Sequence, residues 1–373
     1  RGSVEQEDTG DILRSVRVMC QMGLFGGKGN YAYACARVKA RKSFLLSKDA
    51  YSRMLVMDIH ELGRFLGETQ YKDEMAQYGA RYSGANLVEV AVTRNLAATY
   101  SDILSFTTGH LRETIGNYLR RWDTFNVKTI LRGRMSKARP EEVLDTLVPA
   151  GAFSEEYLKS LVEAEGVHEV MEELAKQASL GITPELHREV VDAGRLAPLE
   201  DHLEKLLYYD LLEVLEPTNT AEALLRDFVR REVDVTNLKV LLKLKAARIP
   251  EERIQRYMVP GGLEFGADKL RAMAQGEGTD ATVSELEKSS MFEDIKPALE
   301  RFKADGRLSE LTIALDKALI GTSEKFANYY PMSVLPIVNY MTRKRVEVDN
   351  IRIIARGKES GLPKAVIEEL LVM

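Results

Sequence analysis

The chain has 373 residues, of which 45% are hydrophobic and 29% are charged, and its formal net charge is −5. This composition is typical of a globular protein with hydrophobic cores, and the length predicts two or three domains of roughly 100–200 residues. The acidic balance argues against nucleic-acid binding, because no overall positive field attracts phosphate. The two cysteines, Cys20 and Cys35, are too few for a disulfide framework or a four-ligand metal site.

The first 28 residues are expected to lie outside the folded domains. They begin RGSVEQEDTG, without a basic-then-apolar signal peptide, and we interpret residues 1–28 as a loose leader or an expression remnant. The glycines of GLFGGKGN at 23–30 do not have the spacing of a phosphate-binding loop. Residues 30–45 carry apolar side chains on one face and predict an amphipathic helix packed on the first domain.

An eleven-residue motif occurs three times. It reads DTFNVKTILRG at 123–133, DVTNLKVLLKL at 234–244 and EVDNIRIIARG at 347–357. Its asparagines, Asn126, Asn237 and Asn350, are 111 and 113 residues apart. Recurrence at a fixed period indicates a repeat architecture, which has to be recognised before a fold is assigned.

Other features keep the same period. Each asparagine is followed 13 or 14 residues later by a proline: Pro140, Pro250 and Pro363. VPAG at 148–151 matches VPGG at 259–262, and VEVAVTRNL at 88–96 aligns with LEDHLEKLL at 199–207 and LTIALDKAL at 311–319. We therefore predict an internal triplication, with repeats at residues 29–150, 151–261 and 262–373.

The predicted secondary structure is helical throughout. VEVAV alone alternates like a strand, but its two counterparts carry apolar residues every three or four positions, which favours a helix in all three. SEEYLKSLVEAEG at 154–166 begins with a serine cap, and TNTAEALLRDFVRREV at 218–233 with a threonine cap. The fold class is therefore all-α, with three similar helical-bundle domains.

Each copy of the motif places an asparagine and an acid on its apolar face, with a cation three residues before the acid. We favour the interpretation that these polar groups fix how helices meet inside each bundle, because buried polar groups are usually satisfied internally. The alternatives are that they line a shared socket or that the acid caps a helix that starts just after it. The residues are Arg120, Asp123, Asn126; Arg231, Asp234, Asn237; and Lys344, Glu347, Asn350.

A pair of cations lies on the opposite side of each motif. Such a pair usually forms only a solvated face, but three copies on three like domains would make a ring of positive charge that binds a partner. The residues of this cationic ridge are Lys128, Arg132, Lys239, Lys243, Arg352 and Arg356.

No catalytic, cofactor or metal motif is recognised. His60-Glu61 and His168-Glu169 lack the second histidine of a zinc-protease helix. The uncharged run FANYYPMSVLPIVNYMT at 326–342 is shorter than the roughly 20 residues of a membrane span, and we expect it to be core or in part a partner-facing patch. We expect no catalytic residue, no cofactor and no metal.

Three segments closely resemble the C subunit of archaeal-type (A/V-type) ATP synthases, whose counterpart in the vacuolar proton pump is the d subunit: NYAYACARVKARKSFLLS at 30–47, MDIHELGRFLGETQY at 57–71 and YLRRWDTFNVKTILRGR at 118–134. The resemblance extends from about Asn30 to Met373. It implies three helical domains around a pseudo-threefold axis, which form a funnel.

The resemblance also implies a function. A protein of this kind is a non-catalytic part of the central stalk at the cytoplasmic face of the membrane. It couples the rotating shaft, made of the D and F subunits, to the membrane ring of proteolipid subunits (c/K), and contacts other subunits of the complex. It binds no nucleic acid and has no membrane span of its own. The alternatives are a helical-repeat scaffold for other soluble partners and an enzyme with a site between domains.

Overall fold

Every regular element of the described structure is a helix. The structure is a computed structural model that describes residues 29–276 and 278–373, and the predicted leader at residues 1–28 lies outside this part. No strand occurs in the described ranges. The all-α prediction is therefore confirmed, including a helix at the predicted opening segment, α2 (Tyr31–Lys42), and a helix across VEVAV. Helix α2 packs on the helix at residues 335–359 as well as on that at residues 84–106, so it does not pack on the first predicted domain alone.

Capping side chains mark where several helices begin. Ser154 accepts a hydrogen bond from the N–H of Tyr157 at the start of its helix, which confirms the predicted serine cap. The predicted threonine cap is wrong, because Asn219 occupies the cap position and accepts from the N–H of Glu222. Asparagine and threonine both satisfy a free N–H of the first turn, so the local sequence TNT does not distinguish between them.

In each of three stretches of the described chain, helices of fewer than 15 residues come before and after the longest helices. The first stretch comprises α3 (Lys48–Val56), α4 (Ile59–Leu66), α5 (Lys72–Tyr78), α6 (Gly84–Phe106), α7 (Gly109–Leu119), α8 (Arg121–Met135) and α9 (Pro140–Thr146). The second comprises α10 (Glu155–Glu163), α11 (Val167–Ala175), the 3₁₀ turn η1 (Ala178–Leu180), α12 (Pro184–Val191), α13 (Ala197–Val214), α14 (Thr220–Ala246) and α15 (Glu251–Arg256). The third comprises α16 (Ala267–Gln275), α17 (Asp280–Glu287), α18 (Phe292–Asp305), α19 (Leu308–Tyr329), α20 (Leu335–Glu359) and α21 (Lys364–Glu369).

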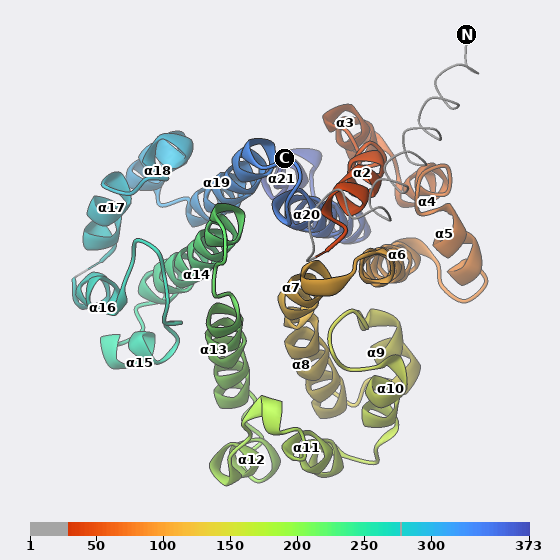
Figure 1. Ribbon diagram of the computed structural model, residues 1–373, viewed down its shortest axis with the longest axis horizontal. Helices are drawn as coiled ribbons and strands as arrows, with labels where there is room; N and C mark the ends of the chain where they lie inside the picture. The colour runs from red at the N-terminus through yellow and green to blue at the C-terminus, as the bar shows by residue number, and fades with distance from the viewer. Residues whose placement is uncertain (1–28, 277) are drawn as a thin grey trace.

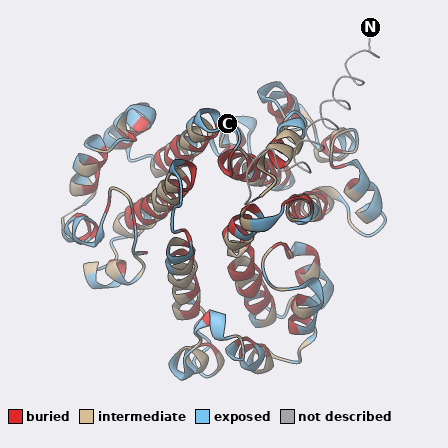
Figure 2. Cartoon of the chain, in the orientation of Figure 1, coloured by how far each residue is buried: buried red, intermediate tan, exposed pale blue. Residues whose placement is uncertain are grey.

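The long helices lie toward the middle of the molecule and the short helices toward the outside (Figure 1). Buried residues follow α6, α14 and α20, whereas the outer short helices keep exposed faces (Figure 2). The tract at 326–342 is partly exposed and partly buried. Tyr329 and Met332 are exposed where α19 turns into α20, and Ile337 and Val338 are buried in α20.

One hydrophobic core crosses a predicted repeat boundary. It joins Ile130 and Leu131 of α8 to Leu158 of α10, Met171 of α11 and Leu199 of α13. The short helices α10–α12 thus fill the space between the long helices of two consecutive stretches, although they follow the predicted boundary at 150/151 in sequence. A helix with one apolar stripe packs on whichever neighbour covers that stripe, so the core does not have to follow the repeat.

The two ends of the described chain pack on each other. Helix α20 lies against α2 and α6, and α21 lies against α3 (Figure 1). Helices α4 and α6 therefore pack on α20, as α10 and α11 pack on α8. Hydrogen bonds between segments far apart in sequence join these ends. Tyr100 Oη donates to the Met341 carbonyl, 241 residues away, and the Leu46 N–H donates to Glu347, 301 residues away.

Candidate functional site: repeated helix joints and a central cavity

The motif asparagines form the same joint in all three copies. The side-chain amide of Asn126 donates to the Val148 carbonyl and accepts from the Val148 N–H, both at 2.8 Å. The asparagine is fully buried, so both of its polar groups need partners, and the valine lies 22 residues further on. The side chain therefore fixes the chain after the short helix α9 onto α8. The other two joints join Asn237 to Val259 and Asn350 to Val372.

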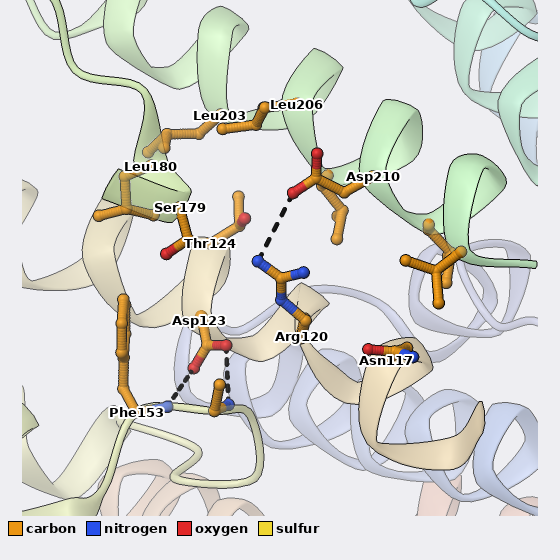
Figure 3. A pocket seen from close by; sticks show the side chains of 14 residues that line it. Asn117, Arg120, Asp123, Thr124, Phe153, Ser179, Leu180, Leu203, Leu206 and Asp210 are labelled. Atoms are coloured by element: carbon orange, nitrogen blue, oxygen red, sulfur yellow. Dashed lines mark hydrogen bonds and ion pairs between the residues drawn. The ribbon is translucent and has the colours of Figure 1, made fainter. Parts of the chain in front are cut away.

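The first motif acid holds the start of the next stretch of chain. Asp123 accepts from the backbone N–H groups of Ala152 and Phe153 at 2.8 and 3.0 Å, just ahead of α10 (Figure 3). A Cβ atom added at Gly151 would lie 2.1 Å from Asp123 Oδ1, so this close approach requires glycine. Burial raises the pKa of the Asp123 carboxyl, and the two N–H groups oppose that shift.

The second acid repeats this arrangement. Asp234 accepts from the N–H groups of Leu263, Glu264 and Phe265 at 2.8–3.1 Å, just ahead of α16. Gly262 stands where Gly151 stands in the first copy, and a Cβ there would lie 2.2 Å from Asp234 Oδ1. The motif acids therefore bind the backbone directly after the VPAG and VPGG segments, and the last glycine of each segment leaves room for the carboxylate. Burial again raises the pKa of the carboxyl, against the backbone donors.

The third acid closes the chain onto its beginning. Glu347 accepts from the Leu46 N–H just ahead of α3, from Tyr71 Oη at 2.5 Å and from Gln70 Nε2 at 2.8 Å. Lys344 Nζ lies 3.3 Å from Glu347 Oε1 and is inaccessible to solvent. Burial lowers the pKa of Lys344 to about 8, although Glu347 acts in the opposite direction.

The cations that precede the acids have different partners in the three copies. Only Lys344 forms an ion pair with the acid three residues later. Arg120 points to Asp210 of α13 at 3.5 Å (Figure 3), and Arg231 pairs with Glu264 at 3.1 Å. Backbone N–H groups already bind the carboxylates of the first two acids, and the two arginines pair instead with an acid on α13 and with an acid in the segment ahead of α16. The cavity beside Arg120 encloses only about 40 Å³ and is a packing gap, too small for an organic ligand.

Five of the six cations of the ridge contact neighbouring helices of the same chain, and Lys243 is the exception among the described residues. In the first copy, Lys128 pairs with Glu204 and Arg132 with Glu200, both on α13. In the second, Lys239 pairs with Asp316 of α19 at 2.6 Å. Arg352 donates to Thr93 and Arg356 pairs with Glu89, both on α6. The acids were present in the aligned segments LEDHLEKLL and LTIALDKAL, but the sequence does not show that the two helices touch. Binding of a partner by the ridge stays a prediction.

Sequence reasoning missed a charged cluster at the centre of the molecule. Arg121 forms two hydrogen bonds of 3.0 Å to the carboxylate of Glu232, and its guanidinium lies 3.7 Å from the centre of the Tyr118 ring. Burial opposes the charge of Arg121, but Glu232 raises the pKa of its guanidinium above the usual value. The signal was available, because Arg121, Glu232 and Arg345 each stand five residues before a motif asparagine.

The central cluster borders two adjoining cavities. One, of about 280 Å³, lies among α8, α13 and α20, and the other, of about 350 Å³, lies among α13, α14, α19 and α20. Glu204, Tyr208 and Arg345 line both, so we treat them together as the central cavity. Within residues 29–276 and 278–373 no group of three or more His, Cys, Asp or Glu side chains is arranged to hold a metal ion.

The sequence of this chain matches one protein-family model over almost its whole length. The ATP synthase (C/AC39) subunit family matches residues 34–370. This chain belongs to that family. All of the motif residues and the central cluster fall within the match, and of the joints only Val372, the partner of Asn350, lies beyond it.

Curated relatives of this ATP synthase (C/AC39) subunit agree with the assignment. It is 36% identical to the C subunit of the A-type ATP synthase of Methanosarcina mazei over 349 residues, which cover 93% of this chain and 94% of the relative. It is 34% identical to the corresponding C subunit of the A-type ATP synthase of Archaeoglobus fulgidus, covering 93% and 98%. That of Haloferax volcanii is also 34% identical, covering 93% and 99%. Among the described residues, no helix has both the length and the apolar character that a membrane span requires.

Proposed function

We propose that this chain is a non-catalytic central-stalk subunit of a rotary A/V-type ATP synthase. In this role it couples the rotating shaft, made of the D and F subunits, to the membrane proteolipid ring (c/K) at the cytoplasmic face of the membrane. It contacts other subunits of the complex and transmits torque during ion-driven ATP synthesis or ATP-driven ion pumping. The observation that carries the proposal is the family match over residues 34–370.

The proposal includes the three repeats predicted from the sequence, arranged as a funnel around a pseudo-threefold axis. Three joints of one design support it, since each motif asparagine binds a valine 22 residues later with two hydrogen bonds. The ion pairs of the ridge add support, because they link α8 to α13, α14 to α19 and α20 to α6. A socket that transmits torque has to resist deformation, and tightly packed helices joined by buried hydrogen bonds provide that stiffness.

The experiment is depletion and reconstitution. Membrane vesicles that carry the complex are stripped of this protein, and ATP hydrolysis and ion pumping are measured before and after the purified chain is added back. We expect stripped vesicles to hydrolyse ATP without pumping ions, and the added chain to restore pumping. Full pumping by stripped vesicles would contradict a coupling role. ATP hydrolysis by the isolated chain would indicate an enzyme, and failure of the chain to bind stripped vesicles would favour a scaffold for other partners.

A further inference from the structure

The second cation of each ridge pair is Arg132, Lys243 or Arg356, and we call this the outer position of the ridge. Two of these three cations pair with an acid on a neighbouring helix. Arg132 pairs with Glu200, and the corresponding Arg356 pairs with Glu89. Lys243 occupies the same position in the second copy, but the residue that aligns with the two glutamates on α19 is Thr312. Lys243 is exposed, and it makes no ion pair with any described residue. The positive charge of Lys243 is therefore not neutralised by an acid of the described residues.

A second uncompensated cation lies in the central cluster. The three equivalent positions carry Arg121, Glu232 and Arg345, so two arginines share one carboxylate. Arg121 donates hydrogen bonds to both carboxylate oxygens of Glu232. Arg345 is half-buried and forms neither a hydrogen bond nor an ion pair with another described residue. Burial opposes the charge of Arg345, but the negative charge of Glu232 raises the pKa of its guanidinium, so it stays a cation.

Both cations line the same cavity. Lys243 and Arg345 are on the walls of the 350 Å³ part of the central cavity. The remaining charges of the whole central cavity are paired within the chain: Lys239 with Asp316, Lys128 with Glu204, Arg121 with Glu232 and Arg352 with Asp349. The cavity therefore carries an excess of two positive charges in a chain whose formal net charge is −5. A cavity with low-dielectric walls strengthens the field of such charges and attracts groups of opposite sign.

The walls of the central cavity are also partly apolar. Val240 and Leu319 line the part that contains Lys243, and Trp122 and Phe125 line the other part. A small inorganic anion would use the cations but not these apolar side chains. A protein segment that carries both carboxylates and apolar residues would use both.

We infer that the central cavity receives an acidic, partly apolar segment of another protein of the complex, whose carboxylates pair with Lys243 and Arg345. This inference rests on the proposed function, because it assigns the cavity to a neighbouring component of the synthase. It adds the chemistry of recognition, namely two specific cations that neutralise the partner.

The test measures binding of the purified full chain to vesicles stripped of this protein, at low and at high salt. Lys243→Glu and Arg345→Glu are compared with wild type, with Arg345→Lys as the conservative variant. The matched control is Lys159→Glu on the outer helix α10, where the lysine is exposed and pairs with Glu163 of the same helix. Because a reversed charge repels an acidic partner, we expect each reversal to weaken binding about tenfold at low salt and the control to change it less than about twofold. Salt should weaken the wild type more than either reversal variant, since fewer attractive pairs remain to be screened.

Arg345 lies beside a buried ion pair, so its variants are also checked for folding by their thermal midpoints, while the exposed Lys243 provides a test that is independent of folding. Recovery of binding with Arg345→Lys would support a role of charge. Wild-type binding that is insensitive to salt and to both reversals would overturn the inference and leave the coupling role intact. No binding by wild type would overturn the proposed function itself. If inorganic phosphate raises the thermal midpoint of wild type but not of Lys243→Glu, and the reversals leave vesicle binding unchanged, the cavity takes a small anion and the inference is wrong.

Discussion

Replacing the second motif asparagine with alanine should destabilise the protein substantially. Asn237→Ala removes two hydrogen bonds of 2.8 Å and leaves the N–H and the carbonyl of Val259 without partners. Val259 is only 3% exposed, so water does not replace the lost bonds. Two lost hydrogen bonds at about 1 kcal/mol each, with about 1–3 kcal/mol for the unpaired groups, give a cost of about 3–5 kcal/mol in the free energy of unfolding, so at least about 3 kcal/mol.

Denaturant unfolding followed by circular dichroism measures this cost, and hydrogen exchange at the Val259 amide measures it locally. A loss of about 3 kcal/mol corresponds to exchange that is roughly a hundredfold faster. The control is Asn328→Ala, an exposed position on α19 whose side chain makes no hydrogen bond to a described residue. Its effect should stay within about 0.5 kcal/mol.

The loss of stability caused by the asparagine-to-alanine substitution should differ among the three joints. Val148 and Val259 are buried, but Val372 is only half-buried, so water can reach the groups that Asn350→Ala exposes. We therefore expect Asn126→Ala and Asn237→Ala to cost more than Asn350→Ala. The reasoning would be refuted if Asn237→Ala cost no more than the Asn328 control, or if Asn350→Ala were the most damaging of the three.

Three further substitutions test other parts of the structure. Gly262→Ala should cost about 1–3 kcal/mol of unfolding free energy, since its Cβ would lie 2.2 Å from a buried carboxylate oxygen, whereas Gly321→Ala, with no atom within 4 Å, should be neutral or slightly stabilising. The thermal stability of the wild type should rise between about pH 8 and pH 10, and Lys344→Met should remove this rise. The pKa of Lys344 in the folded protein is lowered to about 8, so the unfolded chain binds more protons than the folded chain in that range. Arg121→Glu should cost about 3–5 kcal/mol by breaking its buried pair with Glu232, and the double exchange Arg121→Glu with Glu232→Arg should recover part of the loss.

A specific result would contradict each of these three predictions. Equal stability of the two glycine variants would mean that the loop moves away from the acid at little cost. A pH profile that Lys344→Met leaves unchanged would assign the rise to another group. A double exchange at Arg121 and Glu232 that is no better than the single substitutions would show that the pair does not act through charge.

The sequence by itself determined the helical fold, the family and the positions of the motif residues. Helical periodicity is local, so the face that carries Asn126 and Asp123 could be identified as the buried one from spacing alone. The recurrence of the motif at 111 and 113 residues added a second, independent signal, because aligned copies resolve ambiguities such as VEVAV. Capping was less certain, since Thr218 and Asn219 both suit the start of a helix.

Only the tertiary structure decided which groups these residues meet. Asp123 accepts from backbone N–H groups 29 and 30 residues away, whereas Glu347 accepts from Leu46, 301 residues earlier in the chain. The ridge cations were expected to face outward, and most of them instead pair with acids on neighbouring helices. Such pairings depend on which helices pack together and at what angle, and no local pattern encodes that geometry. For the same reason, the excess charge at Lys243 and Arg345 became visible only when the partners of the other cations were known.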